Sequence, residues 1–288
     1  MRSYVLICIV GILTSCGTLL AGPIIIDHTS VGAVASLPQA TLDKVSTDLN
    51  FYFAHASVGT NMMTGLASLA SQNPSRYKLV GVADDGTPPT TTTKGKVYEY
   101  ARGNPAWQTK VDNFKTYINN GWANKVDVVL NKFCYIDPAV TLQYYAISNV
   151  NSSAMSQLEA AYPNTRFVYM TIPLTTDSNA DNISRNTFND ALRQWVITNN
   201  KILFDIADIE SHNLAGVEST FVSGGKTYDK LYSGFSSDGG HLNDAGQKQV
   251  ALGFYALGAA LVPEPVSLLL LTGAAVPMLL RRRHRRCS

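Results

Sequence analysis

Apolar segments recur at wide intervals along the chain, and stretches with helical spacing of apolar positions lie between them. Runs rich in valine, isoleucine, phenylalanine and tyrosine predict strands at 51–53, 77–82, 126–135, 166–172 and 201–206. Helical spacing predicts helices at 58–70, 152–161, 185–198 and 242–261. A threonine- and proline-rich patch at 87–93 predicts an exposed loop.

The predicted strands are apolar through most of their length, which is typical of strands that are covered on both faces. Their alternation with amphipathic helices predicts an α/β fold in three α/β/α layers, with a mainly parallel, flavodoxin-like sheet. In such a fold, ligands bind beyond the carboxyl ends of the strands. Candidate functional residues are therefore expected directly after strands.

The two ends of the chain have patterns of their own. Arg2 and the apolar run 4–13 are the charged and apolar regions of a secretory signal peptide, which we place at 1–21. Cleavage after Ala21 and lipidation of Cys16 are both compatible with this segment. We favour simple cleavage, because a second anchoring device lies at the other end.

That device, at 262–288, combines Pro263-Glu264-Pro265, an apolar stretch at 266–280 and an arginine cluster at 281–286. Fifteen helical residues reach about 22 Å, so the stretch is a marginal transmembrane segment, and the arginines favour a cytoplasmic C-terminus. The three parts resemble the PEP C-terminal sorting signal of bacteria that make exopolysaccharide. The resemblance implies an exosortase as processing partner, a membrane tether through the tail before processing, and a later place at the cell surface or in the matrix. A plain C-terminal anchor is the alternative.

With both ends set aside, one domain remains at 22–261, a length that can bury a substantial core. The whole chain has a net charge of +2, but without Arg2, Glu264 and the five tail arginines the domain has 17 basic and 20 acidic residues. Its own charge is thus −3, and composition gives no support for a nucleic-acid partner. Cys134 is the one cysteine between the two ends, so the domain has no disulfide framework, and its apolar surroundings predict a buried thiol.

Two short segments can supply hydrolytic chemistry. Ser57 follows the first predicted strand and precedes a helix, where backbone N–H groups can stabilise an anion; an ordinary N-cap serine is the alternative. Asp238 and His241 lie three residues apart before the last helix, so a base and the carboxylate that orients it can come from one loop.

Together these segments resemble the SGNH or GDSL-type hydrolases, and the resemblance covers most of the domain. It implies that Ser57 is the nucleophile, His241 the general base and Asp238 its orienting carboxylate, with no cofactor and no metal. Where the family usually has Gly-Asp-Ser, this chain has His55-Ala56-Ser57.

The family builds its oxyanion hole from the serine N–H, a glycine N–H of a second block and an asparagine side chain of a third. Gly103 and Asn104 fit the second block. No Gly-x-Asn-Asp pattern follows the strand near Val129, and Asn131, Asn104 or Lys132 is left as the third donor.

Another group of polar residues, Asp205, Asp208, Glu210 and His212, follows the last predicted strand. Its spacing matches no specific metal motif, and we interpret it as a loop with solvated carboxylates. Asp208 with His212 is second in rank as the catalytic pair. We assign no role to His28, in the N-terminal region.

The sequence thus predicts an exported serine esterase that removes an O-acyl group, with acetyl the first candidate. An acylated polysaccharide is the expected substrate, on the basis of the two resemblances. The rival is a non-catalytic surface or matrix protein that binds glycan, for which tyrosines in predicted loops and helices can stack on sugars: Tyr98, Tyr100, Tyr144 and Tyr145.

Overall fold

The computed structural model describes residues 22–262, and the predicted signal peptide and nearly all of the sorting tail lie outside these residues. Within them the strands run β1 (Ile24–Ile26), β2 (Phe51–His55), β3 (Val80–Ala83), β4 (Lys96–Ala101), β5 (Val128–Asn131), β6 (Arg166–Met170), β7 (Ile202–Phe204), β8 (Thr220–Ser223) and β9 (Lys226–Asp229). The helices are α1 (His28–Ala33), α2 (Gln39–Asp48), α3 (Val58–Gln72), α4 (Trp107–Asn119), α5 (Met155–Ala161), α6 (Ala180–Thr198), α7 (Ile206–Ser211) and α8 (Asp244–Leu261).

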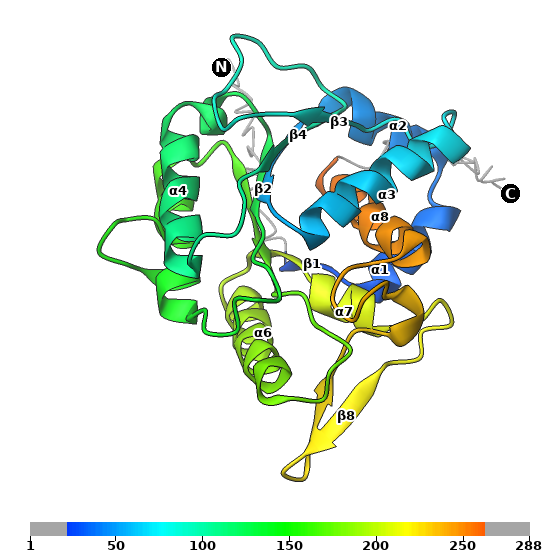
Figure 1. The fold of residues 1–288 in the computed structure, drawn as a ribbon. Coiled ribbons are helices and arrows are strands. Elements are labelled where there is room, and N and C mark those ends of the chain that lie inside the picture. Colours follow the sequence, from blue (N-terminus) through cyan, green and yellow to red (C-terminus); the bar gives the residue numbers. More distant parts are fainter. Residues whose placement is uncertain (1–21, 263–288) are drawn as a thin grey trace, which may run out of the picture.

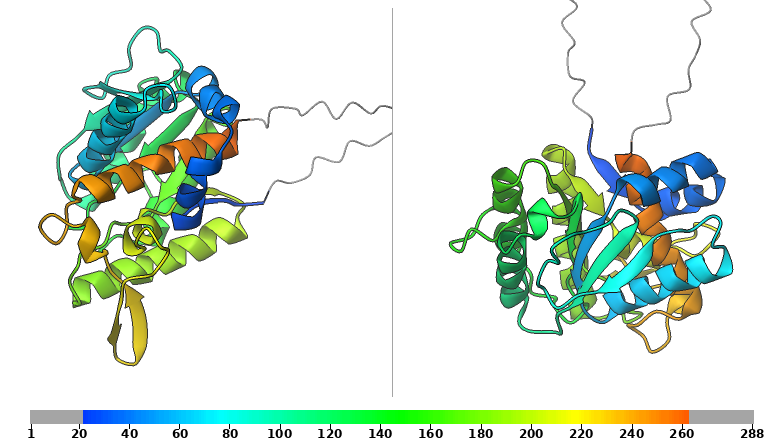
Figure 2. Two further views of the ribbon diagram at one scale, coloured as in Figure 1. Left: turned by 90° about the vertical axis from the view of Figure 1, so that its right-hand side faces the viewer. Right: turned by 90° about the horizontal axis from the view of Figure 1, so that it is seen from above.

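The central sheet has the order β1-β7-β6-β5-β2-β4-β3, and every neighbouring pair in it is parallel. β8 and β9 form a separate antiparallel hairpin that projects from the body (Figure 1). Helices cover both faces of the sheet, with α4 and α6 on one side and α3 and α8 on the other (Figures 1 and 2). The predicted three-layer α/β/α fold with a mainly parallel sheet is therefore confirmed.

The alternation of side chains along β2 explains the two layers of core. Phe51 and Phe53 pack into the core under α3 and α8, while Tyr52 and Ala54 face the second core, under α4 and α6. All these side chains are buried. Because successive residues of a strand point to opposite faces, an apolar residue at every position from 51 to 54 is what a sheet covered on both sides requires.

The strand predicted at 126–135 ends earlier than expected. β5 stops at Asn131, and the following residues form a loop at the carboxyl edge of the sheet, next to β2. The composition of 132–135 is strand-like, but buried charged side chains bind the backbone of this loop, as described below. The strand predicted from apolar composition was therefore too long at its C-terminal end.

The two described ends of the chain lie at one end of the body, away from the loop that precedes α8 (Figure 2). α8 has 18 residues and is therefore about 27 Å long, and it separates this loop from Val262, which is buried against the core at the end of the helix. No helix within residues 22–262 is both long and apolar enough to cross a membrane.

Candidate active site

Ser57 lies directly after β2, at the residue before α3, in a strained backbone conformation with φ 55° and ψ −112°. A residue other than glycine rarely has a positive φ, and such strain persists where the surrounding structure imposes it. The Ser57 side chain makes no capping hydrogen bond to α3. Its Oγ instead lies 2.7 Å from Nε2 of His241, so Ser57 occupies the N-cap position of α3 without serving as a side-chain cap.

His55 and Gly59 explain the sharp turn around Ser57. The His55 side chain is fully buried and contacts Glu99 through Nε2 at 2.8 Å, and burial lowers its pKa. A Cβ added to Gly59 would lie 2.4 Å from the Cβ of His55. Glycine at position 59 therefore lets the first turn of α3 pack directly on the end of β2. The departure from Gly-Asp-Ser thus has a packing role in this chain.

His241 and Asp238 lie in a tight loop before α8. Nδ1 of His241 is 2.7 Å from Oδ2 of Asp238, while Oδ1 of Asp238 accepts the backbone N–H groups of His241 and Gly240 at 2.7 and 3.0 Å. These backbone hydrogen bonds, and the one from the His241 ring, lower the pKa of Asp238 to about 2. Asp238 is therefore an anion at neutral pH, and it favours the tautomer of His241 that carries its proton on Nδ1.

Asn61, which was not singled out from the sequence, joins the serine helix to the histidine loop. Its Oδ1 accepts the backbone N–H of Leu242 at 3.0 Å. Asn61 is four residues after Ser57 and lies one turn further along α3. This i, i+4 spacing could have indicated from the sequence that Asn61 lies on the same face of the helix as Ser57. This contact fixes the loop of His241 relative to Ser57.

The resulting site is open to solvent. The His241 side chain is 37% exposed and that of Asp238 is 55% exposed. The order Ser57, His241, Asp238, linked by two hydrogen bonds of 2.7 Å, is the arrangement in which a histidine takes a proton from a serine while a carboxylate holds its ring. The structure thus brings together the three residues that were proposed as catalytic from the sequence.

Gly103 and Asn104 follow β4, the neighbour of β2 on the side away from β5. The N–H of Arg102 donates to the carbonyl of His55 at 2.9 Å, which ties this turn to the segment before Ser57. Gly103 has a φ of 73°, and both it and Asn104 are exposed. Their position is compatible with the second block of the oxyanion hole, and their role stays a prediction.

The Arg102 and Lys132 side chains stabilise the loop after β5 through hydrogen bonds to its backbone. Nη2 of Arg102 donates to the carbonyl of Lys132 at 2.6 Å, and Nζ of Lys132 donates to the carbonyls of Phe133 at 2.6 Å and Ala56 at 3.3 Å. Burial lowers the pKa of Lys132 to about 8 and that of Arg102 to about 10. The Lys132 ammonium is thus occupied by the backbone on either side of the site.

Asp137 and Arg185 hold the other half of this loop. Oδ2 of Asp137 accepts the ammonium of Lys110 at 2.5 Å and the N–H of Cys134 at 2.8 Å, and Nε of Arg185 donates to the carbonyl of Tyr135 at 2.6 Å. Lys110 and Asp137 are both buried. The Cys134 side chain is also buried, as predicted. The conformation of 132–137 is therefore fixed by charge-assisted bonds to buried groups.

The acidic residues after β7 are not the solvated carboxylates that we predicted. Asp205 is buried in an ion pair with Arg193 at 2.6 Å, and Glu210 is fully buried with its Oε1 on the N–H of Leu174. Burial raises the pKa of Glu210 to about 8. The short helix α7 turns these side chains inward, which a loop prediction could not show.

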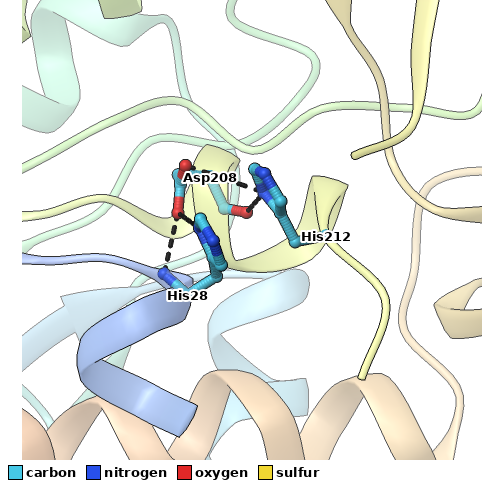
Figure 3. A group of neighbouring side chains, drawn as sticks. All are labelled: His28, Asp208 and His212. Carbon is cyan, nitrogen blue, oxygen red and sulfur yellow. Dashed lines mark hydrogen bonds and ion pairs between the residues drawn. The ribbon is translucent and has the colours of Figure 1, made fainter. Parts of the chain in front are cut away.

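Asp208 and His212 contact each other and His28 (Figure 3). These residues follow β1 and β7, which are separated from β2, the strand before Ser57, by β6 and β5. His28, which was given no role, begins α1; its backbone N and its Nδ1 lie 2.7 and 2.6 Å from Oδ1 of Asp208. The His28 and His212 rings stack at 3.6 Å between centroids, and Nδ1 of His212 lies 2.8 Å from the carbonyl of Asp208. The second-ranked pair is thus part of a clasp between α1 and α7.

One ring nitrogen of each histidine and one carboxylate oxygen of Asp208 lie within 4.8 Å of one another. Within residues 22–262, this clasp is the group whose spacing comes closest to that of a metal site. Two ligands of a tetrahedral zinc ion, each bound at 2.0–2.1 Å, are about 3.3 Å apart. The 2.6 Å between His28 and Asp208 is a hydrogen-bond distance. The parallel rings would have to turn before they could share an ion, and the arrangement is that of a hydrogen-bonded clasp.

The tyrosines considered for glycan stacking differ in their exposure. Tyr145 is fully buried and Tyr98 nearly so, so neither can stack on a sugar; the prediction for these two was wrong. Tyr100 and Tyr144 are partly exposed, and the hydroxyl of Tyr144 bonds the carboxylate of Asp112 at 2.9 Å. Fewer tyrosines than expected are therefore available to the rival function.

No family model and no curated protein matches the chain. Solved structures similar to it include a candidate acylhydrolase from Bacteroides fragilis, with 14% identity over 80% of this chain and 96% of that one and a TM-score of 0.43. They also include a protein described as a platelet activating factor from Streptococcus pneumonia (12% identity, 79% and 90% covered, TM-score 0.41) and the periplasmic domain of a lipopolysaccharide acetyltransferase from Salmonella ser. Paratyphi A (12% identity, 79% and 90% covered, TM-score 0.38). Since identity and TM-score are both low, the function of this chain has to be inferred from its own site.

Proposed function

We propose that the protein is a serine esterase that hydrolyses O-acyl groups through an acyl-enzyme on Ser57. The observation that carries this proposal is the hydrogen-bonded series Ser57 Oγ, His241 Nε2 and Nδ1, and Asp238 Oδ2, at a serine with a strained backbone after the central strand β2. A serine that served only as a helix cap would bond the backbone of α3, which the Ser57 side chain does not do.

The reaction begins when Nε2 of His241 takes the proton of the Ser57 hydroxyl, and Oγ bonds to the carbonyl carbon of the ester. The carbonyl oxygen becomes an oxyanion, which the N–H groups of Ser57 and Gly103 stabilise. The carbon–oxygen bond of the ester then breaks, and the leaving alcohol takes the proton from His241. Water, deprotonated by the same nitrogen, then attacks the carbonyl carbon of the acyl-enzyme. The bond between this carbon and Oγ breaks, Oγ takes the proton back from His241, and the carboxylic acid leaves.

The openness of the site bears on the substrate. His241 and Asp238 are both well exposed, so an ester group on a bulky molecule can approach them without entering a closed pocket. The predicted export and sorting signals favour a surface polysaccharide as this molecule, and acetyl as the acyl group. The loop of His241 precedes α8 and Val262 follows it, so a chain tethered by its C-terminus would hold the site at the far end of this helix, about 27 Å from the tether.

A direct test combines turnover of p-nitrophenyl acetate with labelling by a fluorophosphonate probe. We expect the wild-type protein to hydrolyse the ester and to take up the label, and Ser57→Ala to do neither. Ser68→Ala, on the same helix α3, is the matched control and should behave like the wild type. Absence of both turnover and label from the folded wild-type protein would refute the esterase proposal.

Release of acetate from acetylated polysaccharides tests the substrate class separately. We expect faster release from polymers than from a short acetate ester at equal ester concentration, because the exposed site is suited to a bulky substrate. Equal rates on both would remove the support for a polymer while leaving the esterase activity in place.

A further inference from the structure

Tyr135 lies in the loop 132–137 after β5, and its side chain contacts His241, the proposed base. Its hydroxyl is 3.4 Å from Nδ1 and 3.5 Å from Nε2 of His241, and the two rings meet edge to face at 80° with centroids 5.4 Å apart. Nε2 of His241 is itself 2.7 Å from Oγ of Ser57. The tyrosine hydroxyl is therefore within a few ångströms of the atoms that react.

The Tyr135 hydroxyl lies beside the reacting groups and makes only long contacts, of 3.4 and 3.5 Å, with His241. Both ring nitrogens of His241 already have shorter bonds, to Ser57 and to Asp238. Burial raises the pKa of Tyr135 above its ordinary value of 10, with the Ser57 hydroxyl acting in the opposite direction. The hydroxyl is thus protonated at neutral pH and stands beside the nucleophile as a donor.

The surroundings of Tyr135 hold it in this place. Arg185 binds its carbonyl at 2.6 Å, and Asp137 binds the N–H of the preceding Cys134 at 2.8 Å. A Cβ added to Gly240 would lie 2.8 Å from the tyrosine ring, so the loop of His241 leaves room for this side chain. A donor that is fixed before the reaction begins stabilises developing charge without a cost of reorganisation.

We infer that the Tyr135 hydroxyl is the side-chain donor of the oxyanion hole, in the place where the resemblance implies an asparagine. This inference rests on the proposed esterase function. The three alternatives are less suited to this role. The Lys132 ammonium is occupied by the carbonyls of Phe133 and Ala56, the Asn131 side chain is buried at the end of β5, and Asn104 is exposed in the turn after β4. Tyr135 therefore donates to the oxyanion while His241 transfers the proton.

The substitution Tyr135→Phe tests this role, because it removes the hydroxyl and keeps the ring against His241. We expect kcat for p-nitrophenyl acetate to fall about a hundredfold to a thousandfold, with little change in KM. The inhibition constant of phenylboronic acid, whose adduct with Ser57 is tetrahedral, should rise by a similar factor. Tyr162→Phe, at a partly exposed tyrosine whose hydroxyl donates to Asn119, is the matched control and should keep wild-type values for kcat, KM and the inhibition constant.

The outcomes separate this inference from the proposed function. Wild-type turnover and boronate inhibition in Tyr135→Phe would overturn the tyrosine assignment and leave the esterase proposal intact. A fall in kcat accompanied by a shift in the pH at which activity is lost would show that Tyr135 acts through His241, which also overturns it. No turnover and no fluorophosphonate label in the wild-type protein would refute the esterase proposal itself. Thermal melting of each variant shows whether it is folded.

Discussion

At the scale of single residues, Ser57 combines a strained backbone with a hydrogen bond to the proposed base. Its φ of 55° is unfavourable for any residue with a Cβ, and its hydroxyl bonds His241 instead of capping α3. Such strain costs about 1–3 kcal/mol and is kept where the mechanism needs it.

The strain at Ser57 predicts that two inactive variants of this residue differ in stability. Ser57→Ala and Ser57→Gly both remove the nucleophile, so both should lose esterase activity. Glycine accepts a positive φ, so Ser57→Gly should be more stable than Ser57→Ala by about 1 kcal/mol. Urea denaturation of the two variants measures this difference. Equal stability would mean that the backbone at position 57 is not strained.

Asp238 sets the tautomer of His241, and its substitution separates the two candidate pairs. In Asp238→Asn the amide can donate to Nδ1, which would place the imidazole proton on the nitrogen that must accept from Ser57. We expect kcat to fall about 10³- to 10⁴-fold with the fold unchanged. Asp208→Asn, in the second-ranked pair, should keep wild-type kcat, as measured with p-nitrophenyl acetate. The reverse result would move the active site to α7.

At the scale of elements, the sequence predicted five of the seven strands of the central sheet and missed β4 and β1. The edge strand β3, from Val80 to Ala83, was expected at 77–82. β2, β5, β6 and β7 were expected because they are apolar and end near turns. β4 was missed, since its alternation of charged and aromatic residues from Lys96 to Ala101 is typical of a polar surface. β1 has three residues and gains its place through pairing with β7, which no local pattern reveals.

The clasp between α1 and α7 shows how such an edge strand is held. Asp208 accepts two hydrogen bonds from His28, one from the backbone and one from the ring, directly after β1. Asp208→Ala would leave the His28 N–H without its partner, and we expect a loss of about 2 kcal/mol in the free energy of unfolding. Urea denaturation measures this loss, and Asp48→Ala, at an exposed position of α2, is the control. A loss no larger than in the control would show that the clasp adds nothing.

At the scale of the whole molecule, the site combines segments that are far apart in the sequence. Ser57, Asp238 and His241 could be found in advance, because each belongs to a short pattern next to a predicted element. Tyr135 could not, since its loop was predicted as strand and its role depends on contacts with His241 across 106 positions. The buried cations that hold this loop were equally hidden, because lysine and arginine normally indicate solvent-exposed positions.

The buried charges beneath the site also determine how stability depends on pH. Burial raises the pKa of Glu210 from 4.5 to about 8 and lowers that of Lys132 from 10.5 to about 8. Between pH 4.5 and 8 the folded protein retains the Glu210 proton that the unfolded chain has lost, so this group's contribution to stability falls as pH rises. Between pH 8 and 10.5 the unfolded chain binds the Lys132 proton that the folded protein lacks, so the contribution of Lys132 rises with pH.

These two groups therefore favour a minimum of stability near pH 8. Glu210→Gln removes the group that causes the decline in stability below pH 8. Glutamine has no proton to lose, so the variant should lack the decline between about pH 5 and 8, a slope of up to about 1.4 kcal/mol per pH unit from this group. Urea denaturation at several pH values measures the free energy of unfolding, and Glu159→Gln, at a partly exposed position, is the control. If Glu210→Gln kept the wild-type slope, Glu210 would have to be ionised in the folded protein, with the ammonium of Lys132 as its nearest compensating charge.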